Sequence, residues 1–254
     1  MRNKRGLKVR ATIGQRQRAL TDLLYLKDHY LREFDARVIK AEGDLITLDQ
    51  TAFYPTGGGQ PNDTGIIRWQ SREAQVTDVS KKTGAVTHKL KGPMPPQDAA
   101  IHGVIDWDRR YAFMRYHSAL HVLCGLVYHM YGGLVTGGQI YPERARMDFD
   151  LQDLNPERVQ EIEKACNKEI QESRPITIRF LPRDEAMKHP DLIRTKINLL
   201  PSNISEVRVV DIEGLDVQAD GGTHVANTNE IRGIKVTKTE NKGRINRRME
   251  IVLT

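Results

Sequence analysis

Two short segments constrain the fold of this chain more than any other feature: HSALH and, much later in the sequence, DGGTH. In the first, His117 and His121 stand four residues apart within an apolar run, so on a helix both imidazoles lie on one face. The second segment places a carboxylate, Asp220, four residues before His224. If the fold brings the segments together, they offer three nitrogens and one oxygen to a divalent ion, and zinc takes such ligands in tetrahedral sites. We therefore expect one Zn²⁺ per chain as cofactor.

The glycines of the second segment indicate its local structure. Two consecutive glycines do not continue a helix comfortably, so we expect Asp220 and His224 on a tight loop that follows a strand containing residues 217–218. The helical metallopeptidase motif needs Glu directly after its first histidine, and Ser118 stands there instead. A metallopeptidase of that class is therefore excluded.

Length and cysteine content bound the class of protein. The chain has 254 residues, enough for two modest domains or one large domain. Its two cysteines, Cys124 and Cys166, are far apart in sequence, which is no disulfide framework and suits a reducing cytosol. Cys124 shares a helical face with His121, and we interpret it as a packing residue, with metal ligation as the alternative. No apolar run approaches the roughly 18 residues of a membrane span, so we expect a cytoplasmic protein without a membrane partner.

The net charge of +6 is unevenly distributed. Residues 1–20 carry seven Arg or Lys residues and no acid, while the rest of the chain has 32 basic and 33 acidic residues. We expect residues 1–20 to form a disordered basic tail, and its role stays open between a targeting peptide, an RNA-binding arm and an extension without function. A second basic stretch runs from Arg232 to Arg248. Such clusters can bind a phosphate backbone, although most charge runs are solvated faces.

The pattern of elements predicts an α+β fold in two domains, a β-barrel over residues 21–107 and an α+β domain over residues 108–254. In the first domain, short alternating runs typical of strands are separated by turn signals; they cover residues 36–39, 45–48, 65–69, 74–77, 85–88 and 100–105. Short strands at this spacing favour a small barrel.

In the second domain, the spacing of apolar residues predicts a helix from Arg109 to Tyr131, ended by two glycines. Asn155 followed by Pro156 predicts the start of another helix, which should run to about Glu172. Strands are expected at residues 145–149, 175–182, 206–212 and 231–237, with a hairpin turn at residues 241–243. This pattern is typical of helices packed on a mainly antiparallel sheet.

HSALH followed by GGTHVANT resembles the editing domain of alanyl-tRNA synthetase, and it resembles still more the free-standing AlaX editing proteins. YPTGGGQP, at residues 54–61, is similar to the glycine-rich motif that the longer AlaX proteins carry on a small β-barrel before the editing domain. The resemblance covers roughly residues 21–254 and indicates the medium-sized form. It implies that the three histidines of these motifs bind zinc. Asp220 stands where the family more often has cysteine, and whether this carboxylate binds zinc, admits another metal, or orients a histidine or a water is left open.

The resemblance also implies a trans-editing hydrolase that cleaves the ester of tRNA(Ala) mischarged with serine, with glycine as a further candidate. An alanine pocket rejects glycine or serine only about 10–200-fold by binding, so a second sieve is needed. Zinc could polarise a water or anchor the 3′-terminal nucleotide. Asp220 and Thr223 are the candidate catalytic residues, Asp220 as a general base if it does not bind the metal.

Candidates for substrate binding lie in two glycine-rich stretches. Thr136 and Gln139, which we place in a loop after the first helix, could pair with the hydroxyl that distinguishes serine from alanine; ordinary turn chemistry is the alternative. The other stretch consists of Gly57, Gly58, Gly59 and Gln60. It forms either a tight turn or a backbone that approaches the tRNA end or the editing domain.

Candidate tRNA contacts lie at the start of the histidine-bearing helix and near the C-terminus; they are Arg109, Arg110, Arg115, Lys235, Lys238 and Arg247. The expected partner is mischarged tRNA(Ala), bound by a monomer or a homodimer. The main alternative is a non-catalytic, zinc-containing RNA-binding module, because four protein ligands could close the site. A metallohydrolase for a small ester or amide is a second alternative, which the basic clusters disfavour.

Overall fold

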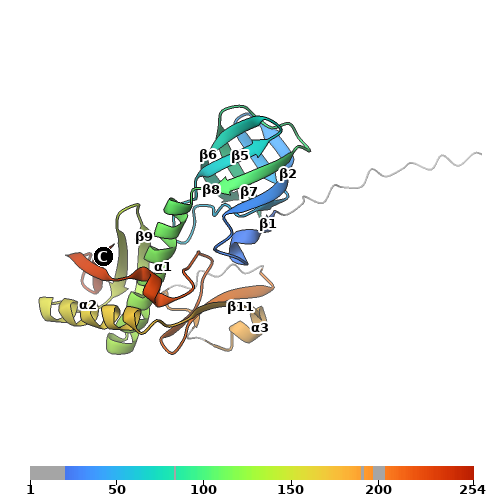
Figure 1. The fold of residues 1–254 in the computed structure, drawn as a ribbon. Helices are drawn as coiled ribbons and strands as arrows, with labels where there is room; N and C mark the ends of the chain where they lie inside the picture. Colours follow the sequence, from blue (N-terminus) through green and yellow to red (C-terminus); the bar gives the residue numbers. More distant parts are fainter. Residues whose placement is uncertain (1–20, 83, 190–191, 197–203) are drawn as a thin grey trace, which may run out of the picture.

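Two parts joined by one long helix make up the molecule (Figure 1). The computed structural model describes residues 21–82, 84–189, 192–196 and 204–254, so the predicted basic tail at residues 1–20 lies outside the described residues. A closed β-barrel lies at one end, and helix α1 (Trp107–Tyr131) runs from the barrel into the other part. The predicted α+β class with an N-terminal barrel is confirmed.

The barrel closes six antiparallel strands in the order β2-β3-β7-β6-β5-β8. These strands are β2 (Glu33–Glu42), β3 (Leu45–Leu48), β5 (Gly65–Trp69), β6 (Arg72–Lys82), β7 (Ala85–Lys91) and β8 (Ala100–Ile105). Alternate residues point inward, as in β2, where Phe34, Ala36 and Val38 are buried between exposed neighbours. All six predicted runs fall within these strands.

A second connection between the two parts comes from the chain before the barrel. Strand β1 (Asp22–Leu23) pairs in parallel with β4 (Gln50–Thr51), and the 3-10 helix η1 (Leu24–Leu26) follows. Beyond η1, His29 and Tyr30 already hydrogen-bond with residues of the other part. The N-terminal segment therefore links the two parts independently of α1.

Helix α1 begins at a polar cap and ends at a glycine. The Asp106 side chain accepts a hydrogen bond from the Arg109 backbone N–H at 3.3 Å. Gly132, with φ of 67°, closes the helix in the left-handed conformation that glycine adopts without strain. Fifteen of the 25 residues are buried, which is more than one amphipathic stripe would bury. The helix is thus central to the second part rather than a cover on its surface.

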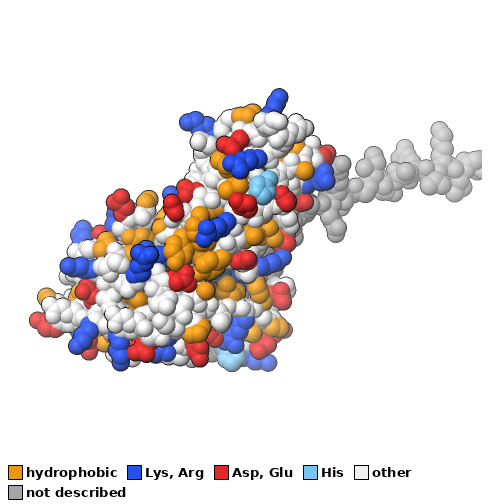
Figure 2. Space-filling model, viewed as in Figure 1, with side chains coloured by type: hydrophobic (Ala, Val, Ile, Leu, Met, Phe, Trp, Pro, Cys, Tyr) orange, Lys and Arg blue, Asp and Glu red, His pale blue; other side chains and the backbone are white. Residues whose placement is uncertain are grey.

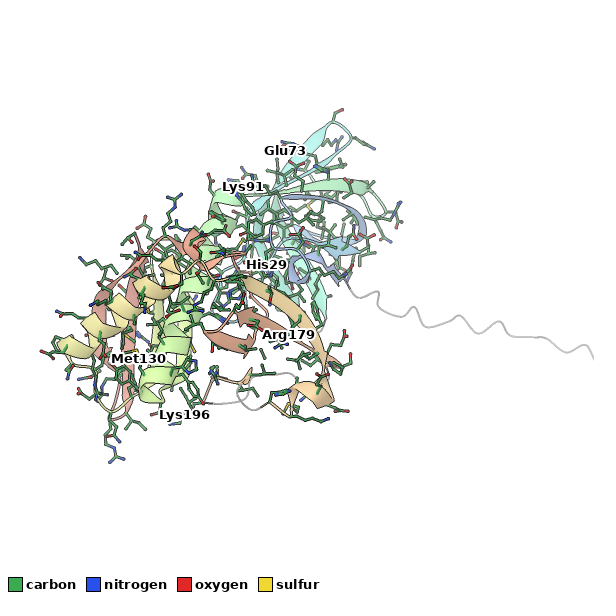
Figure 3. All side chains as sticks on the ribbon, turned by 60° about the horizontal axis from the view of Figure 1, so that its bottom comes forward. His29, Glu73, Lys91, Met130, Arg179 and Lys196 are labelled. Atoms are coloured by element: carbon green, nitrogen blue, oxygen red, sulfur yellow. The ribbon has the colours of Figure 1, made fainter. Side chains whose placement is uncertain are left out.

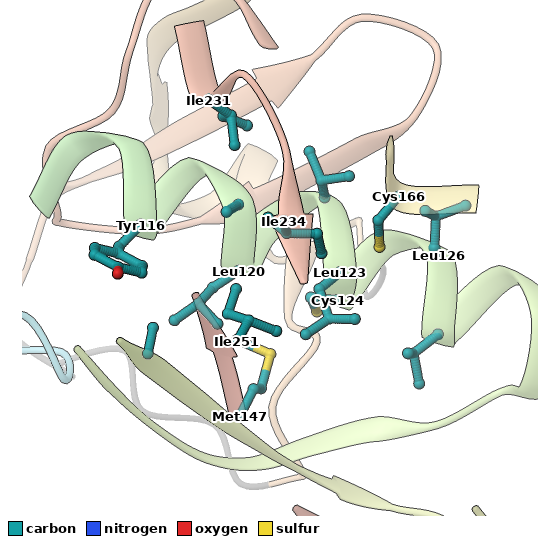
Figure 4. Packing of buried hydrophobic residues seen from close by; sticks show 14 of the residues in the cluster. Tyr116, Leu120, Leu123, Cys124, Leu126, Met147, Cys166, Ile231, Ile234 and Ile251 are labelled. Carbon is teal, nitrogen blue, oxygen red and sulfur yellow. The ribbon is translucent and has the colours of Figure 1, made fainter. Parts of the chain in front are cut away.

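Two antiparallel sheets and a second helix contact α1. One sheet has the order β14-β15-β10-β9 and the other β11-β12-β13. The elements are β9 (Leu134–Ile140), β10 (Ala145–Asp150), α2 (Pro156–Gln171), β11 (Ile176–Pro182), α3 (Arg183–Ala186), β12 (Glu206–Ile212), β13 (Asp216–Ala219), η3 (Thr228–Ile231), β14 (Ile234–Asn241) and β15 (Asn246–Leu253). Their common hydrophobic core includes Leu120 of α1, Cys166 of α2 and Ile251 of β15 (Figure 4).

Most of the predicted elements in this part are confirmed. Helix α2 starts at Pro156 after Asn155, whose side chain accepts the Arg158 N–H at 2.9 Å. Cys124 and Cys166 are buried in the core, as their helical positions predicted. No helix among the described residues is long and apolar enough to cross a membrane.

Two predictions about this part are wrong. Thr136 and Gln139 lie on strand β9 and not in a loop, because the two glycines between them, Gly137 and Gly138, pair with β10 and continue the strand. The strand expected over residues 231–237 begins only at Ile234. The residues before it form η3, which Asn227 and Glu230 stabilise as a capping box.

Candidate metal centre

Three histidines and one aspartate from distant segments converge beside α1. His117, His121, His224 and Asp220 each offer a ligand atom, and these atoms all lie within 4.8 Å of one another. The ring centroids of His117 and His121 lie 4.5 Å and 4.6 Å from that of His224, and 5.2 Å from each other. All three histidines are buried. The structure therefore brings together the helix and the loop that the sequence predicted would meet.

A tight turn after β13 directs Asp220 and His224 toward the helix. The Gly222 N–H donates to Asp220 Oδ2 at 2.6 Å, so the carboxylate shapes its own loop. His224 Nε2 lies 3.1 Å from the same oxygen, and His117 Nε2 lies 3.6 Å from Oδ1. A Cβ at position 222 would lie 2.0 Å from His117 Cε1, so only glycine lets the loop approach this ring.

Gln60, from the glycine-rich segment of the barrel side, orients His117. Its Oε1 lies 2.9 Å from His117 Nδ1 and accepts the Thr223 N–H at 3.1 Å, while its Nε2 donates to Thr223 Oγ1 at 2.9 Å. Because an amide oxygen only accepts, the proton of neutral His117 is on Nδ1, and the Nε2 lone pair faces Asp220. Gln60 and Thr223 are both 0% exposed, so both side chains are enclosed behind the His117 ring. What the structure shows for Gln60 and Thr223 is this support of His117; substrate contact by Gln60 and catalysis by Thr223 stay predictions.

The other two histidines differ in how their rings are held. His224 Nδ1 lies 3.3 Å from Ser118 Oγ, which also accepts the Val225 N–H at 3.1 Å. His121 Nδ1 is buried and has no hydrogen-bond partner among the described residues. A buried polar atom without a partner is costly, and an ion bound to the group would offset that cost. Three imidazoles and a carboxylate are also a donor set that zinc accepts, so the residues present fit this metal.

Burial sets the protonation states that an ion requires. It lowers the pKa of His117 and His121, and it lowers the pKa of His224 well below its usual value, with the neighbouring imidazoles adding to the effect. Burial alone would raise the pKa of Asp220, but its contacts with His117 and His224 hold that pKa well below its usual range. Neutral imidazoles and an ionised carboxylate are the forms that bind a divalent ion.

The glycine-rich segment serves both as a turn and as an approach to the second part. Gly57 and Gln60 pair backbone to backbone across the turn, with Gly58 and Gly59 at positive φ between them. A Cβ on Gly59 would lie 2.7 Å from the carbonyl oxygen of Gly138 on β9. Of the alternatives for this segment, the turn and the approach to the predicted editing domain are both present.

The two polar candidates on β9 lie in different surroundings. Thr136 is exposed, and its hydroxyl donates to Asn246 Oδ1 at 2.9 Å. Gln139 is partly buried, and its Cα lies 3.5 Å from the position of a Cβ on Gly59. Gln139 is therefore next to the segment that supplies Gln60 to the candidate metal centre, whereas Thr136 is hydrogen-bonded to β15, the strand on the far side of β10.

The tRNA prediction for Arg110 is wrong. This side chain is 0% exposed, and its guanidinium is paired with Asp63, which is equally buried. It also donates to the carbonyl oxygens of His29 at 3.1 Å and Ala52 at 2.5 Å. A guanidinium enclosed between helix and barrel does not reach a phosphate, so Arg110 joins the two parts of the protein instead.

The other five candidates for tRNA contact divide into two kinds. Arg109, Arg115 and Arg247 are partly buried and donate to backbone carbonyl groups. Lys235 and Lys238 are exposed on β14. Figure 2 shows Lys and Arg side chains mixed with Asp and Glu over the face it presents. The tRNA contacts of these five residues stay predictions.

Sequence reasoning missed several polar residues that hold the site. Ser118 was noted only because it excludes a metallopeptidase, and His29 had no arguable partner in the sequence. Arg208 and Asp63 carried no motif at all. His29 and His224 are separated by 195 residues, and no local spacing signals such a contact.

Two family models match the chain. One is described as tRNA synthetases class II (A) and matches residues 17–109, which include the barrel and the start of α1. The other is described as Threonyl and Alanyl tRNA synthetase second additional domain and matches residues 207–250, which include Asp220 and His224.

Curated relatives match over almost the whole chain. The alanyl-tRNA editing protein AlaX-M of Saccharolobus solfataricus is 42% identical over 234 residues, 91% of this chain and 98% of the relative. AlaX-M of Methanosarcina acetivorans is 41% identical over 244 residues, 92% of this chain and 99% of the relative. The alanine–tRNA ligase of Thermococcus kodakarensis is 40% identical over 224 residues, 87% of this chain but 24% of the ligase. The chain therefore belongs to the AlaX-M family of alanyl-tRNA editing proteins.

Proposed function

We propose that this protein is a metal-dependent aminoacyl-tRNA deacylase that releases serine wrongly attached to tRNA(Ala). One observation carries the proposal: His117, His121, His224 and Asp220 converge within 4.8 Å in a chain that belongs to an editing family. Glycine is the second amino acid to test, because a site built for alanine rejects the smaller glycine by only about 1–3 kcal/mol of binding.

The chain's own residues prepare the site for zinc. A zinc ion held by the three histidines and Asp220 would supply Lewis-acid chemistry at the aminoacyl ester. Gln60 keeps the proton of His117 on Nδ1, and Ser118 holds the ring of His224. These contacts fix two rings before any ligand arrives, which is how groups outside the ligand set raise metal affinity.

Asp220 has two roles to choose between. Its side chain is 18% exposed and ionised, so it either completes the ligand set or accepts a proton from water. Asp220→Asn keeps the shape of the group but removes its charge. If Asp220 is a ligand, the variant loses zinc affinity; if it is the base, the variant keeps zinc and loses turnover.

We propose Gln139 as the polar partner of the serine hydroxyl. It is next to Gly59, and thus next to the segment whose Gln60 reaches His117. A site that hydrogen-bonds a substrate hydroxyl discriminates strongly against the analogue that lacks it. Gln139→Leu should therefore reduce release of serine more than release of glycine from the same tRNA.

One observation favours a competing function, a non-catalytic RNA-binding module with structural zinc. Four protein ligand atoms are available within 4.8 Å, and four ligands close a tetrahedral site, whereas catalytic zinc usually keeps a position open. The two functions make opposite predictions for release of the amino acid.

The deciding experiment incubates Ser-tRNA(Ala) with the protein and with His117→Ala and His224→Ala variants. Release of serine by the parent and not by the two variants supports the deacylase. His102→Ala is the matched control, because His102 is a surface histidine of the barrel paired with Asp35. Equal release by all four proteins would mean that the histidines do not carry the chemistry. No release by any, with zinc bound, would support the binding module.

A further inference from the structure

A short N-terminal segment reaches from the barrel side to the metal-site loop. We call residues 26–30 the N-terminal brace. At its end, the Tyr30 hydroxyl accepts the Ala226 N–H at 2.8 Å, just beyond His224. Figure 3 labels His29 where the barrel meets the rest of the molecule. The brace is thus placed to hold the loop that carries two of the four candidate ligands.

His29 contacts the backbone of one candidate ligand directly. Its ring is buried, with Nε2 facing the guanidinium of Arg208. A guanidinium only donates, so Nε2 accepts and the proton of the neutral ring is on Nδ1. Nδ1 lies 2.9 Å from both the carbonyl oxygen and the backbone nitrogen of His224, and a protonated Nδ1 donates to the oxygen. The side chain of His29 therefore fixes the main chain of His224.

Arg208, on β12, fixes the main chain of Asp220, the other candidate ligand of the loop. Its side chain is 5% exposed, and Nη1 donates to the carbonyl oxygen of Asp220 at 2.7 Å. Nη1 also lies 3.9 Å from Asp220 Oδ2, close enough to offset the carboxylate charge without occupying Oδ1. Nε donates to Leu26 O at 3.1 Å, so the same guanidinium binds both brace and loop.

The brace is itself fixed from behind. Arg110 Nη1 donates to the carbonyl oxygen of His29 at 3.1 Å, and the same guanidinium is paired with the buried Asp63. The backbone of His29 is thus held by α1 and the barrel side, while its side chain holds the loop. A change at His29 removes the link between a fixed support and the ligands without removing any ligand.

We propose that His29 and Arg208 are positioning residues of the metal centre, which hold the backbone of Asp220 and His224 in place before an ion binds. The inference rests on the metal site of the proposed function. A loop that is already ordered loses less conformational freedom on binding, so the affinity for the ion is higher. Neither residue belongs to the converging group of ligand atoms.

The test measures the Kd of the full chain for Zn²⁺ alone, by competition with a chromophoric chelator. His29→Ala should raise this Kd about 10–100-fold, the usual cost of losing a group that supports a ligand. His88→Ala is the matched control: His88 is also a fully buried histidine, but it is hydrogen-bonded to Thr51 in the barrel core. Both variants should unfold at a lower temperature, and only His29→Ala should lose zinc affinity.

Two conservative variants separate positioning from general stability. His29→Asn keeps a donor near the place of Nδ1 and should recover most of the affinity. His29→Gln keeps only a group near the place of Nε2, toward Arg208, and should recover less. Should His29→Ala not fold, the order of these two variants decides the question in the same way.

Several outcomes would overturn the proposal. An unchanged Kd in His29→Ala, an equal loss in His88→Ala, or equal affinities of the Asn and Gln variants each contradict it. If the parent protein binds zinc but the Kd values of the variants do not follow the expected order, only the positioning role is rejected and the proposed function stands. If the parent binds no zinc, the metal site fails and the positioning role fails with it. If the zinc affinities follow the expected order but the parent protein does not deacylate Ser-tRNA(Ala), the proposed activity is rejected and the positioning role stands.

Discussion

The junction between barrel and helix and the candidate metal centre each place an aspartate next to a buried arginine, but in opposite arrangements. At the junction, Arg110 Nε lies 3.0 Å from both oxygens of Asp63, and neither side chain is exposed. At the metal centre, Arg208 reaches the carbonyl oxygen of Asp220 and stays 3.9 Å from its carboxylate. The first carboxylate is fully paired within the protein, whereas the second faces the histidines of the candidate metal centre. The two arginines therefore differ in their target: Arg110 binds a carboxylate, whereas Arg208 binds a backbone carbonyl group and leaves the carboxylate accessible.

The largest effect is expected at the junction. Arg110→Met leaves the carboxylate of Asp63 buried and without its cation, which should lower the free energy of unfolding by about 3–5 kcal/mol. Arg109→Met is the matched control, because Arg109 is partly buried and donates to a backbone carbonyl; it should cost less than about 1 kcal/mol. Urea unfolding of both variants measures the difference. Equal losses would mean that the buried pair contributes no more than a surface contact.

The two regions also differ in their buried histidines. In the barrel, His88 is buried apart from the other histidines and is hydrogen-bonded to Thr51. His88 is 0% exposed, and burial lowers its pKa to about 4 from the usual 6.5. The folded state favours the neutral ring. The free energy of unfolding is therefore not reduced by His88 above pH 6.5, and it decreases as the pH falls toward 4, where the buried ring is protonated. The loss over that range should be about 3 kcal/mol.

His88→Phe isolates this effect from the other buried histidines. With the protein kept metal-free, urea unfolding at several pH values between 7 and 4 should give a steeper decline for the parent than for the variant. The difference in slope approaches about 1.4 kcal/mol per pH unit below pH 6. Parallel curves would show that His88 is not responsible for the acid sensitivity.

A smaller effect is expected from a methyl group at the metal centre. A Cβ at Gly222 would lie 2.0 Å from His117 Cε1, whereas nothing lies within 4 Å of one at Gly221. Gly222→Ala should therefore displace the His117 ring or the loop and raise the Kd for zinc at least about tenfold, or about 1.4 kcal/mol. Gly221→Ala should leave it within about twofold. Calorimetric titration with zinc compares the two, and equal affinities would contradict the close approach.

The sequence predicted what local spacing can encode. A four-residue interval places His117 and His121 on one helix face, and alternation identifies the barrel strands, because both follow from the backbone repeat. The double glycine predicted the loop that carries Asp220. The same reasoning misplaced Gln139, because glycines within a paired strand, such as Gly137 and Gly138 on β9, cannot be told by residue type from glycines of a loop.

Contacts between distant polar residues could not be predicted in this way. Gln60 and His117 are 57 residues apart, and Arg208 and His29 are 179 apart. Such pairs have no period, and their partners are fixed only when the barrel side and α1 meet. The sequence also could not reveal that Arg110, in a run with Arg109, is enclosed, because exposure depends on what packs over the helix. Side-chain type and spacing predicted the candidate ligands, whereas the residues that hold them in place are defined only by the packing of the folded chain.

The smallest expected effect is a change in affinity for tRNA(Ala), which distinguishes whether the tRNA contacts β14 or the barrel. Lys235 is exposed on β14, and Lys40 is exposed on the barrel strand β2, where it pairs with Glu42. If β14 contacts the phosphate backbone, Lys235→Ala should weaken binding of tRNA(Ala) about twofold to fivefold at low salt and reduce the slope of log K against log salt by about 0.9. Lys40→Ala should change neither. Binding measured at several salt concentrations distinguishes the two surfaces. An equal salt slope for both variants would exclude β14 from the tRNA interface. A loss of affinity only in Lys40→Ala would place the contact on the barrel.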